Sequence, residues 1–214
     1  MMKNRGFTLV EILVGMAISL LVIGSIYSVY QTQQKSYVVQ EQVTVMQQNL
    51  RAGMTMLTRD IRMAGYDPTV SVTVGITLAN SNTLQFTRLD DSLTAIETIT
   101  YTLQDNGGDG DNDLFRNAGG GPQLIAENID ALNFVYLNQN GYALDDDGSG
   151  NVTTNISNIR SIQVTMVART GRVDLNYTNN NNYQNQLNEN IYIANDNYRR
   201  RLLTREIYCR NLGL

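Results

Sequence analysis

Residues 1–30 read MMKNRGFTLV EILVGMAISL LVIGSIYSVY, a short basic head followed by an apolar run. Lys3 and Arg5 make the head basic, and residues 12–29 carry no charge. An α-helix rises about 1.5 Å per residue, so this run is just long enough to cross the hydrocarbon core of a membrane. The basic head is expected on the cytoplasmic side. The segment therefore predicts a helix whose residues 7–30 lie in a membrane or in another apolar environment.

Glu11 is the residue that does not fit a simple anchor, because its carboxylate lies one turn inside the apolar helix. A charged side chain at the centre of a membrane helix costs roughly 2.5 kcal/mol or more, and such groups usually have a function. Glu11 is therefore the first candidate functional residue.

The stretch from Gly6 to Glu11 resembles the processing site of type IV prepilins and of type II secretion pseudopilins. The resemblance implies a leader peptide of residues 1–6, which a prepilin peptidase removes after Gly6 before it methylates Phe7. Glu11 occupies the place of the family's glutamate. It is expected to pair with the Phe7 amine of a neighbouring subunit during assembly, because two charges that are costly alone become tolerable together. A secretory signal peptide is the alternative, but residues 24–28 form a poor cleavage site for one.

Composition excludes several classes of function. The chain has 214 residues, a formal net charge of -4 and no histidine, which excludes a Ser-His-Asp triad and histidine-ligated metal sites. Cys209 is the single cysteine, so no disulfide can form within the chain. Basic residues are few and scattered, so no nucleic-acid partner is predicted. We expect no enzymatic activity.

Residues 31–66 are expected to continue the helix in amphipathic form. Apolar residues recur there at spacings of three and four, as expected of a helix with one buried stripe: Val39, Val43, Met46, Leu50, Met54, Leu57 and Ile61. Gly65 and then Pro68 are stop signals. The predicted helix therefore spans residues 7–66.

The end of this helix, Leu57–Tyr66, resembles the corresponding segment of PilW-type minor pilins and, more loosely, of J-type pseudopilins. Asp60 and Arg62 belong to that segment. Without the resemblance, both would be interpreted as solvated residues of a last helical turn.

From residue 67 onward the hydropathy pattern changes to a period of two, which is typical of half-buried strands. Expected strands lie at residues 83–87, 95–103, 113–116, 132–137, 159–168 and 202–208, with a break at Gly119–Pro122. The connections suit an antiparallel sheet. The fold class is therefore α+β: a long helix packed on an antiparallel β domain of residues 67–214, as in type IV pilins.

Acidic and polar loops are the remaining candidates. Asp145, Asp147, Ser149 and Asn151 alternate as in the first half of a calcium loop, but Ile156 stands where such a loop has its last glutamate. The alternative is a solvated turn. Residues 109–113 form a weaker second candidate. Residues 176–197 are expected to be a long exposed loop, or else a partner-binding one, and Arg199–Arg201 a solvated strand start.

The resemblance implies a minor pilin of the PilW type that primes or caps assembly of a type IV pilus. Its expected partners are the prepilin peptidase and methylase, other minor and major pilins and the inner-membrane assembly platform. It would lie in the bacterial inner membrane with its C-terminal domain outside the cytoplasm, and then on the cell surface. Two alternatives stay open: a type II secretion pseudopilin, and a membrane-anchored extracytoplasmic protein that binds calcium or another ligand.

Overall fold

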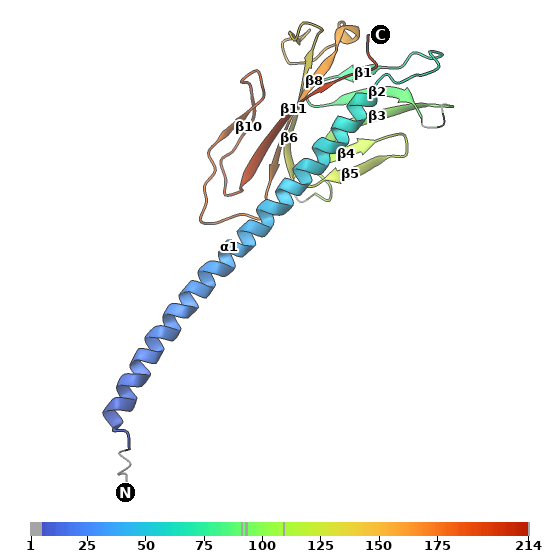
Figure 1. Cartoon of the computed structure of the whole chain (residues 1–214). Coiled ribbons are helices and arrows are strands. Elements are labelled where there is room, and N and C mark those ends of the chain that lie inside the picture. The colour runs from blue at the N-terminus through green and yellow to red at the C-terminus, as the bar shows by residue number, and fades with distance from the viewer. Residues whose placement is uncertain (1–5, 91, 93, 109, 214) are drawn as a thin grey trace. The chain divides into compact units, whose positions relative to one another are not determined.

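The computed structural model describes residues 6–90, 92, 94–108 and 110–213. One helix, α1 (Leu9–Met63), precedes a set of antiparallel strands (Figure 1). The predicted α+β fold class is therefore confirmed. Two compact units divide the chain, Met1–Glu41 and Gln42–Leu214. The second unit begins inside α1 rather than at residue 67, because the last turns of the helix belong to the core of the β domain.

Within the second unit, α1 supplies one side of the hydrophobic core. The predicted stripe is buried from Met46 onward, with Met46, Leu50, Met54, Leu57 and Ile61 all at most 3 % exposed. Gly53 lies on the same stripe. A Cβ at Gly53 would lie only 2.9 Å from Cδ2 of Leu114 and 3.2 Å from Cε of Met166. The absence of a side chain there lets the helix approach both sheets closely.

The first sheet has five strands that follow one another in space as they do in sequence. They are β1 (Ile76–Ala79), β2 (Leu84–Leu89), β3 (Ile96–Gln104), β4 (Asp113–Asn117) and β5 (Pro122–Ala126), all antiparallel. The predicted strands near residues 83–87, 95–103 and 113–116 are confirmed. The sequence pattern missed β1 and β5, which are short edge strands and therefore have little alternating burial.

The second sheet has four strands in the order β11-β8-β6-β7. Their bounds are β6 (Ile129–Leu137), β7 (Ala143–Leu144), β8 (Ser161–Arg169) and β11 (Arg200–Tyr208), and a 3₁₀ helix, Ile156–Asn158, precedes β8. The three long strands were expected from the period of two. Core residues of this sheet, such as Phe134, Val164 and Met166, pack in one cluster with those of α1 and the first sheet.

The C-terminal end of α1 is closed by the C-terminal tail of the chain. Gly65 follows the helix with a φ of 74°, the left-handed conformation that glycine adopts most easily. Nδ2 of Asn211 donates to the carbonyl oxygen of Arg62 at 3.1 Å and to that of Ala64 at 3.4 Å. These bonds satisfy carbonyl groups that have no partner within the helix.

Asp60 is buried, so the interpretation of Asp60 as a solvated residue of the last helical turn is wrong. Its Oδ2 lies 2.5 Å from Nε of Arg116 in β4 and accepts a 2.8 Å hydrogen bond from the Tyr101 hydroxyl in β3. Burial, and then the Asp60 carboxylate, raise the pKa of Tyr101 well above its ordinary value, so the phenol remains a donor. Arg62, two residues later, is exposed as expected.

The asparagine-rich segment is not the long loop that was expected. It contains the hairpin β9 (Asn182–Gln184) and β10 (Asn190–Ile193). Neither is Arg200 solvated: its side chain is fully buried, pairs with Asp130 and Asp196, and lies over the ring of Tyr192. Hydrophobic periodicity failed here because ion pairs and amide hydrogen bonds, rather than apolar side chains, hold the segment.

Cys209 follows β11 and is 4 % exposed. Burial raises the pKa of its thiol to about 12, so the thiol stays protonated at neutral pH.

Candidate functional site

The predicted cleavage and assembly residues lie at the start of α1. Thr8 is the residue before the first helical residue, Leu9, and Glu11 is in the first turn. Oε2 of Glu11 accepts hydrogen bonds from the Thr8 backbone nitrogen at 2.8 Å and from the Thr8 hydroxyl at 2.9 Å. Oγ1 of Thr8 in turn accepts from the Glu11 backbone nitrogen at 3.3 Å. This reciprocal arrangement is a capping box.

The capping box directs the Glu11 carboxylate back along the chain toward residue 7. A cut after Gly6 would make the Phe7 nitrogen a cationic amine, one residue from the Thr8 nitrogen that already donates to Glu11. Thr8 therefore belongs to the site, although reasoning from charge and hydropathy overlooked it. Its signal is the pattern Thr-x-x-Glu directly before an apolar run.

The bond on which processing would act is accessible in this structure. Gly6 is exposed, no atom lies within 4 Å of the position of a Cβ added there, and Phe7 is 86 % exposed. Lys3 and Arg5 of the predicted leader lie outside the described residues.

The apolar turns of α1 are exposed on all sides. Every residue from 9 to 30 is exposed, including Leu20 at 68 %, Leu21 at 74 % and Ile26 at 63 %. The most apolar window of the helix has a mean hydropathy of 2.4 with no part of it buried, and by length and composition the helix can cross a membrane. A helix that is apolar all round is typical of a membrane span or of the inside of a larger assembly.

Three hydroxyl groups in this part of α1 are satisfied within the helix. Ser19, Ser25 and Thr32 each donate to the carbonyl oxygen four residues earlier, at 2.8, 2.8 and 3.0 Å. An unsatisfied hydroxyl is costly where no water is present, so these bonds suit the helix to an apolar environment.

The loop predicted to hold calcium has its carboxylates engaged internally. Oδ1 of Asp145 accepts from the Gly148 backbone nitrogen at 2.8 Å, and Oδ1 of Asp147 accepts from that of Ser149 at 2.8 Å. Oδ2 of Asp147 accepts from Nδ2 of Asn151 at 2.7 Å, which, first among several hydrogen bonds, lowers the pKa of Asp147. Oδ1 of Asn151 accepts from the backbone nitrogen of Ser81. These are the bonds of a polar turn, and the calcium site stays a prediction.

In the second candidate loop, residues 109–113, two carboxylates make contacts with other parts of the β domain. Asp109 lies outside the described residues, Asp111 pairs with Arg169, and Oδ1 of Asp113 accepts from the Asn128 nitrogen at 2.8 Å. Among the described residues, no group of three or more histidine, cysteine, aspartate or glutamate side chains is placed to hold a metal ion.

Comparison with known proteins gives a motif and a fold. Residues 1–27 match the family model described as the prokaryotic N-terminal methylation motif. The structure is similar to that of a type IV-like pilin from Thermus thermophilus, with a TM-score of 0.53 and 14 % sequence identity. The match covers 78 % of this chain and 96 % of the other. No curated protein sequence matches the chain.

Proposed function

We propose that this chain, a type IV prepilin-like protein by its motif and its fold, is a minor pilin of the PilW type. In this proposal it primes or caps the assembly of a type IV pilus. The observation that carries the proposal is Glu11, a carboxylate held at the start of the apolar part of α1, whose residues 9–30 are all exposed. The resemblance of Leu57–Tyr66 to PilW-type proteins supports the subtype.

Assembly follows from the chemistry of the two charges. After cleavage, the amine of Phe7 and the carboxylate of Glu11 enter an apolar environment among the helices of other subunits. Each charge alone is costly there, whereas a pair with satisfied hydrogen bonds is tolerated. The Thr8 hydroxyl and backbone nitrogen supply two of those hydrogen bonds. The carboxylate is thereby held in place before a neighbouring subunit arrives.

In this proposal the chain is first anchored in the membrane and is then processed and assembled. The apolar part of α1 first anchors the precursor in the bacterial inner membrane with the C-terminal domain outside the cytoplasm. The prepilin peptidase then cuts after Gly6 and methylates Phe7, and the assembly platform moves the chain into a filament with other minor and major pilins. The motif and fold support a structural subunit, and in this proposal the chain is the substrate of an enzyme.

A type II secretion pseudopilin is the second candidate, because the same motif and helix serve both machines. The genes beside the coding sequence, for pilus or for secretion components, distinguish the two. A membrane-anchored binder of calcium or another ligand is the candidate from a different class. For that candidate, mass spectrometry of sheared filaments should find no cleaved chain.

Processing tests the shared part of the proposal. Gly6→Val should leave the full-length precursor in the membrane, because a branched side chain then occupies the residue before the cut. Gly15→Val is the matched control: it makes the same change inside α1, where a Cβ would likewise meet no atom, and should be processed normally. Intact-mass spectrometry of the membrane fraction measures both. A mature wild-type N-terminus after residue 24 would refute the proposal.

A further inference from the structure

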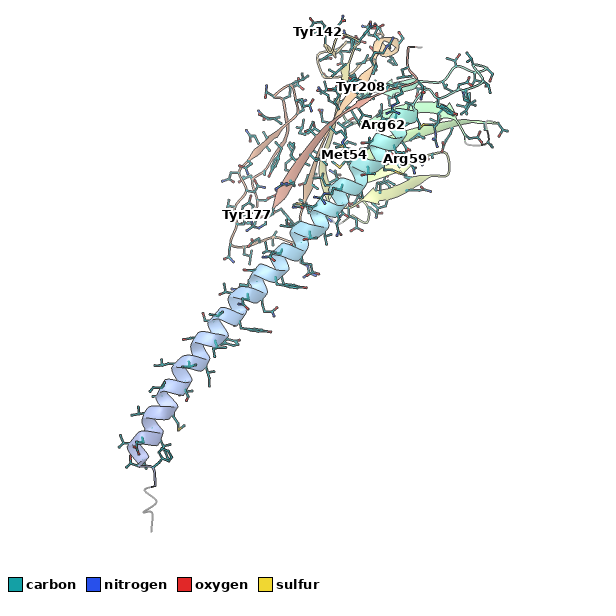
Figure 2. The ribbon with its side chains drawn as sticks, viewed as in Figure 1. Met54, Arg59, Arg62, Tyr142, Tyr177 and Tyr208 are labelled. Atoms are coloured by element: carbon teal, nitrogen blue, oxygen red, sulfur yellow. The ribbon has the colours of Figure 1, made fainter. Side chains whose placement is uncertain are left out.

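A groove of about 680 Å³ lies between the last turns of α1 and strand β11, within the second compact unit. Its lining includes Arg59, Arg62, Met63, Tyr66, Arg205 and Arg210. Figure 2 shows Arg59 and Arg62 on the last turns of the helix. The N-terminal apolar part of α1 supplies none of these residues, so the groove is a separate feature from the cleavage and assembly site.

Four arginines line this groove, although the chain carries a net charge of -4. All four are exposed. Arg59 has one contact with a carboxylate, 3.5 Å from Asp60, and Asp60 is already bound to Arg116. Among the described residues, no carboxylate lies within 4 Å of the guanidinium groups of Arg62, Arg205 or Arg210. The groove is therefore a positive site without its own counter-charge.

One wall of the groove offers backbone groups as well as charge. Arg205 belongs to β11, which is an edge strand of its sheet and, in the part of the chain that the structure describes, pairs with β8 alone. The outward backbone groups of an edge strand can pair with an added strand. On the other wall, Arg59 and Arg62 are three residues apart and so lie on one helical face. Met63, the last residue of α1, and Tyr66 add apolar surface to the lining.

We infer that this groove binds an extended acidic segment of a neighbouring filament subunit. An added strand presents every second side chain to the same face, and carboxylates on that face can reach the arginines of both walls. Arginine binds carboxylates through two parallel hydrogen bonds, which gives geometric specificity in addition to charge. This inference rests on the proposed function, because only an assembled filament brings such a neighbour to the groove.

Binding is tested first outside the filament, with the full chain in neutral-detergent micelles. The probe is a fluorescent peptide in which glutamate and threonine alternate, and its control has glutamine in place of each glutamate. Fluorescence anisotropy should show the glutamate peptide binding roughly tenfold more tightly or better, with an affinity that falls as salt rises. Equal binding of both peptides would overturn the inference. Displacement of the probe by inorganic phosphate, at a phosphate concentration equal to that of the glutamate side chains in the probe, would also overturn it and would indicate a non-specific anion site.

Charge reversal locates the binding. Arg62→Glu/Arg205→Glu should weaken probe binding by about tenfold or more, since two of the four positive groups become repulsive. Arg51→Glu/Arg172→Glu changes the net charge equally at exposed positions outside the groove and should leave the affinity unchanged. Arg62→Lys/Arg205→Lys keeps the charge without the paired donors and should lose about threefold. If the glutamate variant fails to fold, the lysine variant provides the test. Probe affinity of the lysine variant equal to that of Arg51→Glu/Arg172→Glu would then contradict the inference.

Filament incorporation separates this inference from the proposed function. If the chain is a filament subunit and the groove binds its neighbour, wild type appears in sheared filaments and Arg62→Glu/Arg205→Glu is several-fold depleted. Equal amounts of both refute the groove alone. Absence of the wild type from filaments refutes the proposed function, while the peptide experiment still reports on the groove.

Discussion

Two parts of the same helix have similar apolar side chains but opposite surroundings. In residues 9–30 of α1, Leu20 and Leu21 are 68 % and 74 % exposed. In residues 46–61, Leu57 and Ile61 are fully buried against the two sheets. The first part is apolar on every side, whereas the second has one apolar stripe. Apolar surface needs a partner in both cases, and the pattern around the helix indicates whether the chain itself supplies it.

The two parts of the helix should affect different properties of the protein. Changes in the first part should alter insertion and assembly without altering the stability of the β domain. Changes in the second part should lower that stability even in an isolated subunit. Each substitution below is therefore measured for the property that its region is expected to control.

The largest effect is expected at Glu11. Glu11→Gln keeps a side chain that can complete the capping box but removes the charge, so a buried amine at Phe7 would lose its partner. Breaking a buried pair costs on the order of 3–5 kcal/mol. Filament incorporation should fall strongly while cleavage after Gly6 continues and the unfolding of the β domain is unchanged.

Two further variants make the Glu11 experiment specific. Glu11→Ala removes the charge and the Glu11 half of the capping box, while the Thr8 hydroxyl still accepts from the backbone nitrogen of residue 11. Glu41→Gln removes a charge from an exposed position farther along the helix and should assemble normally. The measurement is the cleaved chain in sheared filaments relative to the membrane. Equal incorporation of Glu11→Gln and wild type would eliminate the pairing mechanism.

The next effect is expected at Arg116, on the stability side of the comparison. Arg116→Met leaves the buried Asp60 carboxylate without its buried ion partner and with only the exposed Arg59 guanidinium at 3.5 Å, which should cost about 3–5 kcal/mol of unfolding free energy. Asp60→Leu/Arg116→Met removes both charges and should recover much of the loss. Arg172→Met, at an exposed position, should change stability by less than about 0.5 kcal/mol. Urea unfolding of the full chain in detergent measures all three, and a double variant less stable than the single one would contradict this account.

A smaller effect is expected from glycines of the two parts. Gly53→Val should lower the unfolding free energy by about 1–3 kcal/mol, because the added side chain meets Leu114 and Met166. Gly53→Ala should be close to neutral, since better helix propensity of about 1 kcal/mol offsets the contact with the flexible end of Leu114. Gly24→Val has no atom within 4 Å of its Cβ and should not affect unfolding. Equal effects of valine at both glycines would remove the distinction between the two parts.

The smallest effect is expected in the acidic loop, which belongs to neither part of the helix. A calcium site predicts that millimolar calcium raises the melting temperature, because a ligand that binds only the native state stabilises it. Asp147→Ala should abolish that rise, whereas Asp105→Ala, in another exposed turn, should not. The internal hydrogen bonds of the loop make us expect a small rise at most. Identical melting with calcium and with chelator would leave only the turn.

The sequence predicts the features of this molecule that have a period or a motif. The helix stripe from Met46 to Ile61 is buried at the spacings of three and four that predicted it, and β3 alternates in burial near its middle. Strands β6 and β8 were also predicted, although they are buried at almost every residue. The roles of Gly6, Phe7 and Glu11 are predictions from the motif, and the structure shows that the Thr8 hydroxyl donates to Glu11.

Features that depend on contacts between distant residues were not predictable. Asp60 is 56 residues from Arg116 in the chain, and Arg200 is 70 residues from Asp130. No local pattern reports that a charged residue will meet its partner across the core, so the residue pattern alone predicts a solvated side chain at both Asp60 and Arg200. The hairpin β9–β10 was not predicted for the same reason, because contacts with distant residues hold it. The groove beside β11 likewise exists only because the chain's last strand lies next to its first helix.

Burial of Cys209 has a practical consequence for labelling the protein with fluorescent dyes. A thiol that is 4 % exposed and whose pKa is raised to about 12 is unreactive toward maleimide dyes at neutral pH. No other cysteine is present in the sequence. A cysteine introduced at an exposed residue such as Tyr142, which is 70 % exposed, would therefore take up one dye without prior removal of the native one. Single molecules of this subunit could then be followed by fluorescence microscopy on living cells.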